Sequence, residues 1–158
     1  MKITLTDGTG SGPTRLAAFD AALLQAGICN YNLLVLSSVI PEGAVIVPEK
    51  FAAPPDDREY GYRLYVVMAH CEVDEPGKAA WAGLGWVQES QHSRGLFVEF
   101  QGESYSDVHE KIDNTLTAMT RSRGRDYTPI QSKVVGILCE NEPVCAMVVA
   151  VYKSEGWQ

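Results

Sequence analysis

The chain has 158 residues, 46% hydrophobic and 21% charged, a composition typical of one soluble globular domain with its own core. The formal net charge is -7 and no basic run occurs, so nucleic acid and anionic membranes are not expected as partners. No apolar run is long enough to cross a bilayer and no secretory signal opens the chain, so we expect a cytoplasmic protein.

The N-terminal segment predicts a strand, a loop and a helix. The strand is Lys2 to Thr6, and the glycines within residues 7–12 indicate a tight turn. Their spacing is not the G-x-G-x-x-G of dinucleotide-binding proteins, and no P-loop lysine follows them. The helix is expected from about Thr14 to Ala26, where Gly27 ends it. The stripe that faces the core is expected to consist of Leu16, Phe19, Leu23 and Ala26.

The stretch from Asn30 to Gly43 has the most distinctive pattern of the sequence. The apolar residues Leu33 to Leu36 and Val39 predict a strand that stops at a turn marked by Pro41 and Gly43. Between the apolar run and the turn lies the pair Ser37-Ser38, where the extended backbone is expected to bend sharply. A strained peptide bond before a serine hydroxyl permits an N→O acyl shift, after which β-elimination and hydrolysis leave a pyruvoyl group. Serines at strand ends more often bond locally to the backbone, so the pair alone leaves both interpretations open.

The middle of the chain predicts further strands. Ala44 to Val47 is a short extended piece, and Leu64 to Val73 is apolar on both faces. Ala79 to Val87 is expected to pair with the strand before it. Its Gly83 and Gly85 indicate a bulge or a close approach of backbone.

The C-terminal third predicts a strand, a helix and a hairpin. Leu96 to Gln101 alternates, so that Glu99 shares one face with Phe97 and Gln101. Ser104-x-x-Asp107 is a capping signature for a second helix. The last two strands, Lys133 to Cys139 and Val144 to Tyr152, are expected to form a hairpin. The stripe of the helix that faces the core is expected to consist of Val108, Ile112, Thr115 or Leu116, and Met119.

Many strands and two amphipathic helices indicate an α+β fold. Because several strands are apolar on both faces, each sheet has to be covered on both sides. Two stacked sheets with a helix outside each satisfy this requirement, and periodicity alone allows a two-layer α+β sandwich equally well. The four cysteines and three histidines share no ligand spacing, so we expect free thiols and no metal site.

Several motifs together resemble the pyruvoyl-dependent arginine decarboxylases. In the same order as in that family, the chain has Phe19-Asp20 to Ile28, Asn30-Tyr31-Asn32, Ser37-Ser38, Pro41-Glu42, Tyr60-Gly61-Tyr62 and Gly95 to Gly102. The resemblance covers most of the chain. It implies a four-layer α/β/β/α sandwich of two packed, mainly antiparallel sheets with a helix on each outer face. It also implies a homo-oligomer, a trimer or a hexamer, with sites between subunits.

The resemblance implies a single domain, 1–158, that cleaves itself between Ser37 and Ser38. The products are a β chain, 1–37, and an α chain, 38–158, with a covalent pyruvoyl group made from Ser38 and neither metal nor pyridoxal phosphate. L-arginine would be converted to agmatine and CO2 through a Schiff base, in which the ketone accepts the electrons that the departing CO2 leaves on Cα.

The family match also implies roles for individual residues. Glu99 matches the proton donor, and Asn32 matches a residue that orients carbonyl oxygens near the pyruvoyl group. Asp20 matches the carboxylate that binds the substrate guanidinium, typically across a subunit boundary. The other expected substrate-binding residues are Leu23, Gly27, Tyr31 and Ser37. Two alternatives stay open: a pyruvoyl decarboxylase of histidine or lysine, and an uncleaved homologue that only binds ligand.

Overall fold

The computed structural model describes residues 1–158 as nine strands and two helices. The helices are α1 (Arg15–Ala26) and α2 (Tyr105–Arg123). The strands are β1 (Lys2–Ser11), β2 (Asn32–Val35), β3 (Val39–Ile40), β4 (Val45–Pro48), β5 (Arg63–Val73), β6 (Ala79–Gln88), β7 (Gly95–Gly102), β8 (Gln131–Leu138) and β9 (Val144–Glu155). Neither helix combines the length and the apolar composition that crossing a membrane requires.

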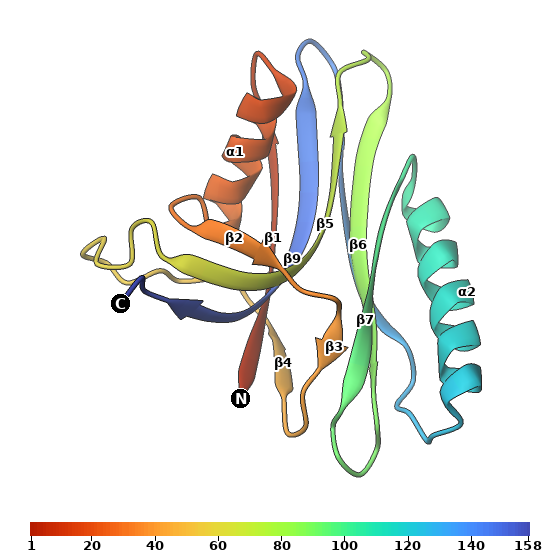
Figure 1. Ribbon diagram of the computed structural model, residues 1–158. Coiled ribbons are helices and arrows are strands. Elements are labelled where there is room, and N and C mark those ends of the chain that lie inside the picture. Colours follow the sequence, from red (N-terminus) through yellow and green to blue (C-terminus); the bar gives the residue numbers. More distant parts are fainter.

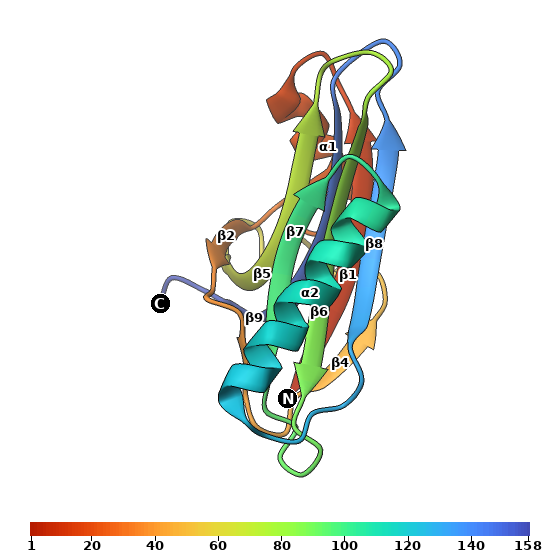
Figure 2. The ribbon, with the colours of Figure 1, turned by 90° about the vertical axis from the view of Figure 1, so that its right-hand side faces the viewer.

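The strands form two sheets that pack face to face between the helices (Figure 1). The five-stranded sheet has the order β2-β5-β9-β1-β4, and α1 covers its outer face. The four-stranded sheet has the order β3-β7-β6-β8, and α2 runs obliquely across its outer face (Figure 2). Only β1 with β4 and β2 with β5 pair in parallel. The predicted four-layer α/β/β/α sandwich is therefore confirmed.

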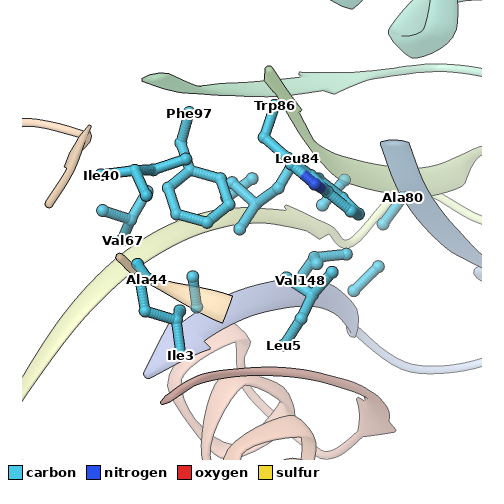
Figure 3. Close-up of a cluster of buried hydrophobic side chains, with 14 of the residues drawn as sticks. Ile3, Leu5, Ile40, Ala44, Val67, Ala80, Leu84, Trp86, Phe97 and Val148 are labelled. Carbon is cyan, nitrogen blue, oxygen red and sulfur yellow. The ribbon is translucent and has the colours of Figure 1, made fainter. Parts of the chain in front are cut away.

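The largest core lies between the two sheets (Figure 3). Leu5 and Val148 point into it from the five-stranded sheet, and Leu84 and Phe97 meet them from the four-stranded sheet. All four side chains are buried. Two smaller cores lie under α1 and α2, so every long central strand is covered on both faces. This double coverage explains why these strands are apolar on both faces.

Most of the glycine-rich segment, residues 7–11, belongs to β1 and is not the predicted loop; Gly12 follows the end of the strand. Its glycines alternate along the strand on the face beneath α1. A methyl group on Gly8 would collide with the main chain of Ala22, and one on Gly10 would lie 2.6 Å from the Cβ of Ala21. The glycines therefore allow the helix to approach the sheet closely, and they do not form a turn.

The buried face of α1 agrees with the predicted stripe at Leu23 and Ala26 and in part at Phe19, but not at Leu16. Its smallest side chains, Ala18, Ala22 and Ala26, are fully buried, whereas Leu16 is 76% exposed. Alanine is needed on this face because the helix packs directly on the glycines of β1. Thr14 caps the helix by accepting a hydrogen bond from the Ala17 amide, and Gly27 ends it in the left-handed conformation, as expected.

The second helix and its sheet agree with the sequence more closely. Val108, Ile112 and Leu116 are buried, and Ser104 accepts a hydrogen bond from the Asp107 amide at the N-cap. Side chains of α2 occupy the space above Gly83 and Gly85, where added methyl groups would collide with Val108 and Ile112. The predicted bulge is absent, and the close approach at these two glycines is made by side chains of the helix and not by its backbone.

Two predicted pairings between consecutive strands are wrong. β5 pairs with β2 and β9, whereas β6 pairs with β7 and β8 in the other sheet. β8 and β9 likewise lie in different sheets and form no hairpin. Each connection passes from one sheet to the other, so the consecutive strands face each other across the core. Alternation along one strand cannot distinguish this arrangement from a hairpin.

An ion cluster at Asp7 joins the two sheets beside the core. Asp7 lies on β1, and its carboxylate is 2.9 Å from the Nζ of Lys133 on β8 and 3.1 Å from the Nζ of Lys50. Partial burial raises the pKa of the Asp7 carboxyl, but the hydrogen bonds and charges of the two lysines outweigh it. The net result is a pKa below the ordinary value of 3.8.

We expect Asp7→Asn to lower the free energy of unfolding by about 1–2 kcal/mol at neutral pH, because the partly buried Lys133 and the more exposed Lys50 both lose a charged partner. Because the pKa of the Asp7 carboxyl is lower in the folded than in the unfolded chain, its ionised form stabilises the fold at pH values above the unfolded pKa. The difference in unfolding free energy between the wild type and Asp7→Asn should therefore be complete above about pH 5. It should disappear as the pH falls through the folded pKa. Urea unfolding in a Ser38→Ala background, which is expected to keep the chain in one piece, measures it.

Asp74→Asn is the matched control, because Asp74 forms a 2.9 Å ion pair with Arg15 on the exposed surface. Water screens that pair, so little change is expected. An Asp7→Asn protein as stable as the control at neutral pH would contradict a structural role for the cluster.

Candidate active site

The chain changes sheets at the Ser37-Ser38 pair, where the sequence predicted a sharp bend of the extended backbone. β2 belongs to the five-stranded sheet and β3 to the four-stranded sheet, and Figure 1 shows the chain passing between them. The Leu36 amide donates to the Val66 carbonyl at 2.8 Å and extends the first ladder. The Phe97 amide donates to the Ser38 carbonyl at 2.8 Å and extends the second. Ser37 is the one residue between them.

Ser38 has a backbone conformation that serine rarely adopts. Its φ is 76°, in the left-handed region that favours glycine. For a residue with a Cβ atom this conformation costs roughly 1–2 kcal/mol. The two ladders on either side hold the residue there. The backbone strain in the serine pair therefore lies at Ser38, directly after the Ser37–Ser38 peptide bond.

The hydroxyl of Ser38 donates a hydrogen bond to Oε1 of Glu99 at 2.6 Å. Glu99 lies on β7 and points inward with Phe97, as the alternation of this strand predicted. The contact is partly buried. A carboxylate at this distance can accept the proton of a hydroxyl that attacks a carbonyl carbon. The structure therefore places two of the predicted site residues in direct contact.

Tyr152 is a neighbour of this pair that the sequence did not single out. It lies on β9 in the five-stranded sheet, and its hydroxyl donates to the Val39 carbonyl of β3 at 2.9 Å. Its ring packs against Phe97, with 6.3 Å between centroids. Burial and then the charge of Glu99 raise the pKa of Tyr152. The phenol therefore remains a hydrogen-bond donor.

Asn32 is hydrogen-bonded away from Ser38. Its side-chain amide donates to the Gly61 carbonyl at 2.8 Å, and the same carbonyl accepts a 2.9 Å bond from the indole of Trp157. The Asn32 backbone amide donates to Tyr62 at 2.8 Å. In this arrangement Asn32 orders the start of β2, and its predicted role near the pyruvoyl group stays a prediction.

The predicted substrate-binding residues of α1 and its C-terminal connection do not meet Ser38 within one chain. Asp20 is exposed, and its side chain makes no hydrogen bond or ion pair. Leu23 is 9% exposed in the core under α1, and Gly27 caps the helix with a φ of 86°. The hydroxyl of Tyr31 donates to Glu59 at 2.7 Å, whereas Ser37 is exposed beside Ser38. Binding roles for these residues stay predictions.

A cavity of about 310 Å³ lies beside β3 but does not include Ser38 or Glu99. Its walls contain Arg94, Arg123 and Arg125, and Glu89 neutralises part of their charge. No group of three or more His, Cys, Asp or Glu side chains is positioned to hold a metal ion.

Comparison with known proteins gives a consistent set of relatives. The family described as "Pyruvoyl-dependent arginine decarboxylase (PvlArgDC)" matches residues 2–155. A pyruvoyl-dependent arginine decarboxylase of Halobacterium salinarum is 35% identical over 153 residues, which are 96% of this chain and 93% of that protein. One of Methanothermobacter thermautotrophicus is 53% identical over 124 residues, which are 78% of each protein.

Two further similarities come from a more distant sequence and a solved structure. A pyruvoyl-dependent arginine decarboxylase of Thermococcus sibiricus is 34% identical over 95% of this chain and 93% of its own length. A structure of pyruvoyl-dependent histidine decarboxylase at pH 8 aligns with a TM-score of 0.46 and 14% identity. That alignment covers 65% of this chain and 53% of the other, about half its length.

Proposed function

The chain belongs to the pyruvoyl-dependent arginine decarboxylase family, and on this premise we propose that it converts L-arginine to agmatine and CO2 with a covalent pyruvoyl group made from Ser38. The observation that best supports the proposal is the strained Ser38, whose hydroxyl is bonded to Glu99 at the junction of the two sheets. The residues around Ser38 suit such a group. The Phe97 amide holds the carbonyl of residue 38, which self-cleavage leaves in place, and Glu99 lies within hydrogen-bond reach.

Self-cleavage starts from the Ser38 hydroxyl. Glu99 accepts its proton while Oγ attacks the carbonyl carbon of Ser37, and the Ser37–Ser38 amide bond breaks to give an ester and a free amine. Loss of the Cα proton of residue 38 then expels the Ser37 carboxylate. Water hydrolyses the resulting imine, releases ammonia and leaves the ketone on residue 38. Leaving the left-handed conformation relieves strain in the starting chain.

We expect the purified protein to contain two chains, 1–37 and 38–158, with the larger one blocked at its N-terminus. Ser38→Ala has no hydroxyl for the attack and should remain a single chain. Ser37→Ala keeps the attacking group and is the matched control, which should still cleave. Intact-mass spectrometry under denaturing conditions distinguishes these results. An uncut wild-type chain that decarboxylates arginine would overturn the proposal.

Decarboxylation requires an electron acceptor next to the substrate Cα and a proton donor on the same side. A pyruvoyl group at residue 38 would supply the acceptor, because its ketone can condense with the substrate amine. Glu99 is suited to deliver the proton, because its carboxyl already contacts residue 38. The same side chain thus takes a proton during self-cleavage and supplies one during turnover.

Glu99→Gln preserves size but cannot transfer a proton in the same way. We expect slower self-cleavage and, in the cleaved fraction, a kcat about 10²–10⁴-fold below that of the wild type. Glu103→Gln, an exposed change just after β7, is the control. Cleavage is followed by gel and turnover by CO2 release. Wild-type kcat in cleaved Glu99→Gln would assign the donor role to another group.

The exposed Asp20 carboxylate, which has no partner within one chain, supports a site that is completed by a second copy of the chain. Asp20 lies on the outer helix, and the exposed Leu16 and Leu24 on the same helix offer apolar surface for association. Leu34, Val35 and Val39 are exposed beside the serine pair. We therefore propose a trimer, or a hexamer of two trimers, in which Asp20 of one subunit binds the guanidinium at the Ser38 of its neighbour. We also propose the cytoplasm as its location.

Asp20→Asn removes the carboxylate charge that would form a planar, bidentate ion pair with the substrate guanidinium. We expect a loss of about 2–5 kcal/mol in arginine binding, seen as a higher KM, with normal self-cleavage. Asp113→Asn, an exposed change on α2, controls for net charge. Steady-state kinetics with arginine, lysine and histidine measure the effect. Faster turnover of lysine or histidine by the wild type would refute arginine as the substrate.

A further inference from the structure

Cleavage at Ser37 removes one of the two attachments of residue 38. In the uncut chain, residue 38 is held on one side through Ser37 and Leu36, which is bonded to β5. On the other side it continues into β3, a strand of only two residues paired with β7. After cleavage the reactive end of the 38–158 chain depends on β3 and on the bonds made by residues 38 and 39.

The backbone of Val39 has no partner in its own sheet. Val39 lies opposite Leu96, between the pairs that residues 38 and 40 make with β7. In an antiparallel ladder, the N–H and C=O groups of such a residue point away from the neighbouring strand. β3 is also the edge of its sheet, so the Val39 carbonyl faces outward. The Val39 side chain is 58% exposed and adds little packing.

Tyr152 supplies the missing partner from the other sheet. Its hydroxyl bonds the Val39 carbonyl at 2.9 Å, while its ring packs on Phe97, whose amide bonds the Ser38 carbonyl. The Tyr152 side chain therefore contacts both Val39 of β3 and Phe97 of β7. Among residues 38–40, this is the hydrogen bond that links the segment to the five-stranded sheet once Ser37 is released.

We propose that Tyr152 is a positioning residue that holds the new N-terminus of the 38–158 chain against β7 and within reach of Glu99. The inference rests on the proposed function, because it concerns the chain after self-cleavage. Without the Tyr152 hydroxyl, β3 keeps only its short pairing with β7. Residue 38 then moves in and out of contact with Glu99. In the uncut chain Ser37 still restrains residue 38, so the hydroxyl matters little there.

Tyr152→Phe removes only this hydroxyl, and hydrogen exchange of the Ile40 and Phe97 amides reports on the segment. In the cleaved protein, we expect these amides to exchange about fivefold or more faster than in the wild type, the effect of one lost hydrogen bond. In uncut Ser38→Ala, adding Tyr152→Phe should change the same amides less than about twofold. Cleaved Tyr152→Phe should also show a lower kcat for arginine with an unchanged KM.

Tyr65→Phe is the matched control. Its hydroxyl bonds Glu155 at 3.1 Å in the same sheet, away from residues 38–40. It should leave exchange at Ile40 and Phe97 unchanged. Equal exchange in cleaved wild type and cleaved Tyr152→Phe would overturn the inference while self-cleavage stands. Faster exchange in both cut and uncut proteins, or a Tyr152→Phe chain that never cleaves, would instead make Tyr152 part of the uncut fold. An uncut wild type would reject both proposals, and mass spectrometry identifies that case.

Discussion

The passage of the chain from one sheet to the other within three residues is the constraint on which the site depends. Leu36 is tied to β5 and Ser38 to β7, so the backbone between them has no freedom to relax. Ser38 is consequently held at a φ of 76°, with its hydroxyl directed at Glu99. A loop of ordinary length at this point could present the same two serines without strain. The stacking of two separate sheets therefore determines the geometry of Ser38 and Glu99 as well as the fold.

Local features of the fold were predictable from the sequence, whereas strand partners were not. Thr14, Ser104 and Gly27 act within one helical turn, and their capping roles follow from residue type. The sheet to which β6 or β8 belongs depends on contacts with distant strands. In either sheet, β6 and β8 would have one face on the central core and the other face under a helix, so their apolar patterns would be the same. The glycines of β1 were wrongly interpreted as a turn. A strand that packs closely against a helix is rich in glycine for a different reason, and the sequence alone does not distinguish the two cases.

The candidate site shows the same division between local and distant information. Ser38 and Glu99 were identified through their family motifs, and the structure brings them to 2.6 Å. The Phe97 amide escaped prediction because a backbone group has no residue signature. Tyr152 was not predicted because its contact with Val39 requires β9 to lie opposite β3. The hairpin predicted for β8 and β9 did not allow that arrangement. Asp20 and Asn32 are in place on their own elements, but one chain alone does not bring them to Ser38.

The position of β1 determines how a cut protein behaves after denaturation. β1 lies between β4 and β9, so the first 37 residues contribute an internal strand of a sheet built mainly by the rest of the chain. The uncut chain can assemble this sheet as a unimolecular reaction. Once the chain is cut, recovery requires two molecules to meet, and its yield depends on protein concentration. In the maturation that we propose, the molecule folds first and is cut afterwards, and its two pieces can regain the structure only by associating with each other.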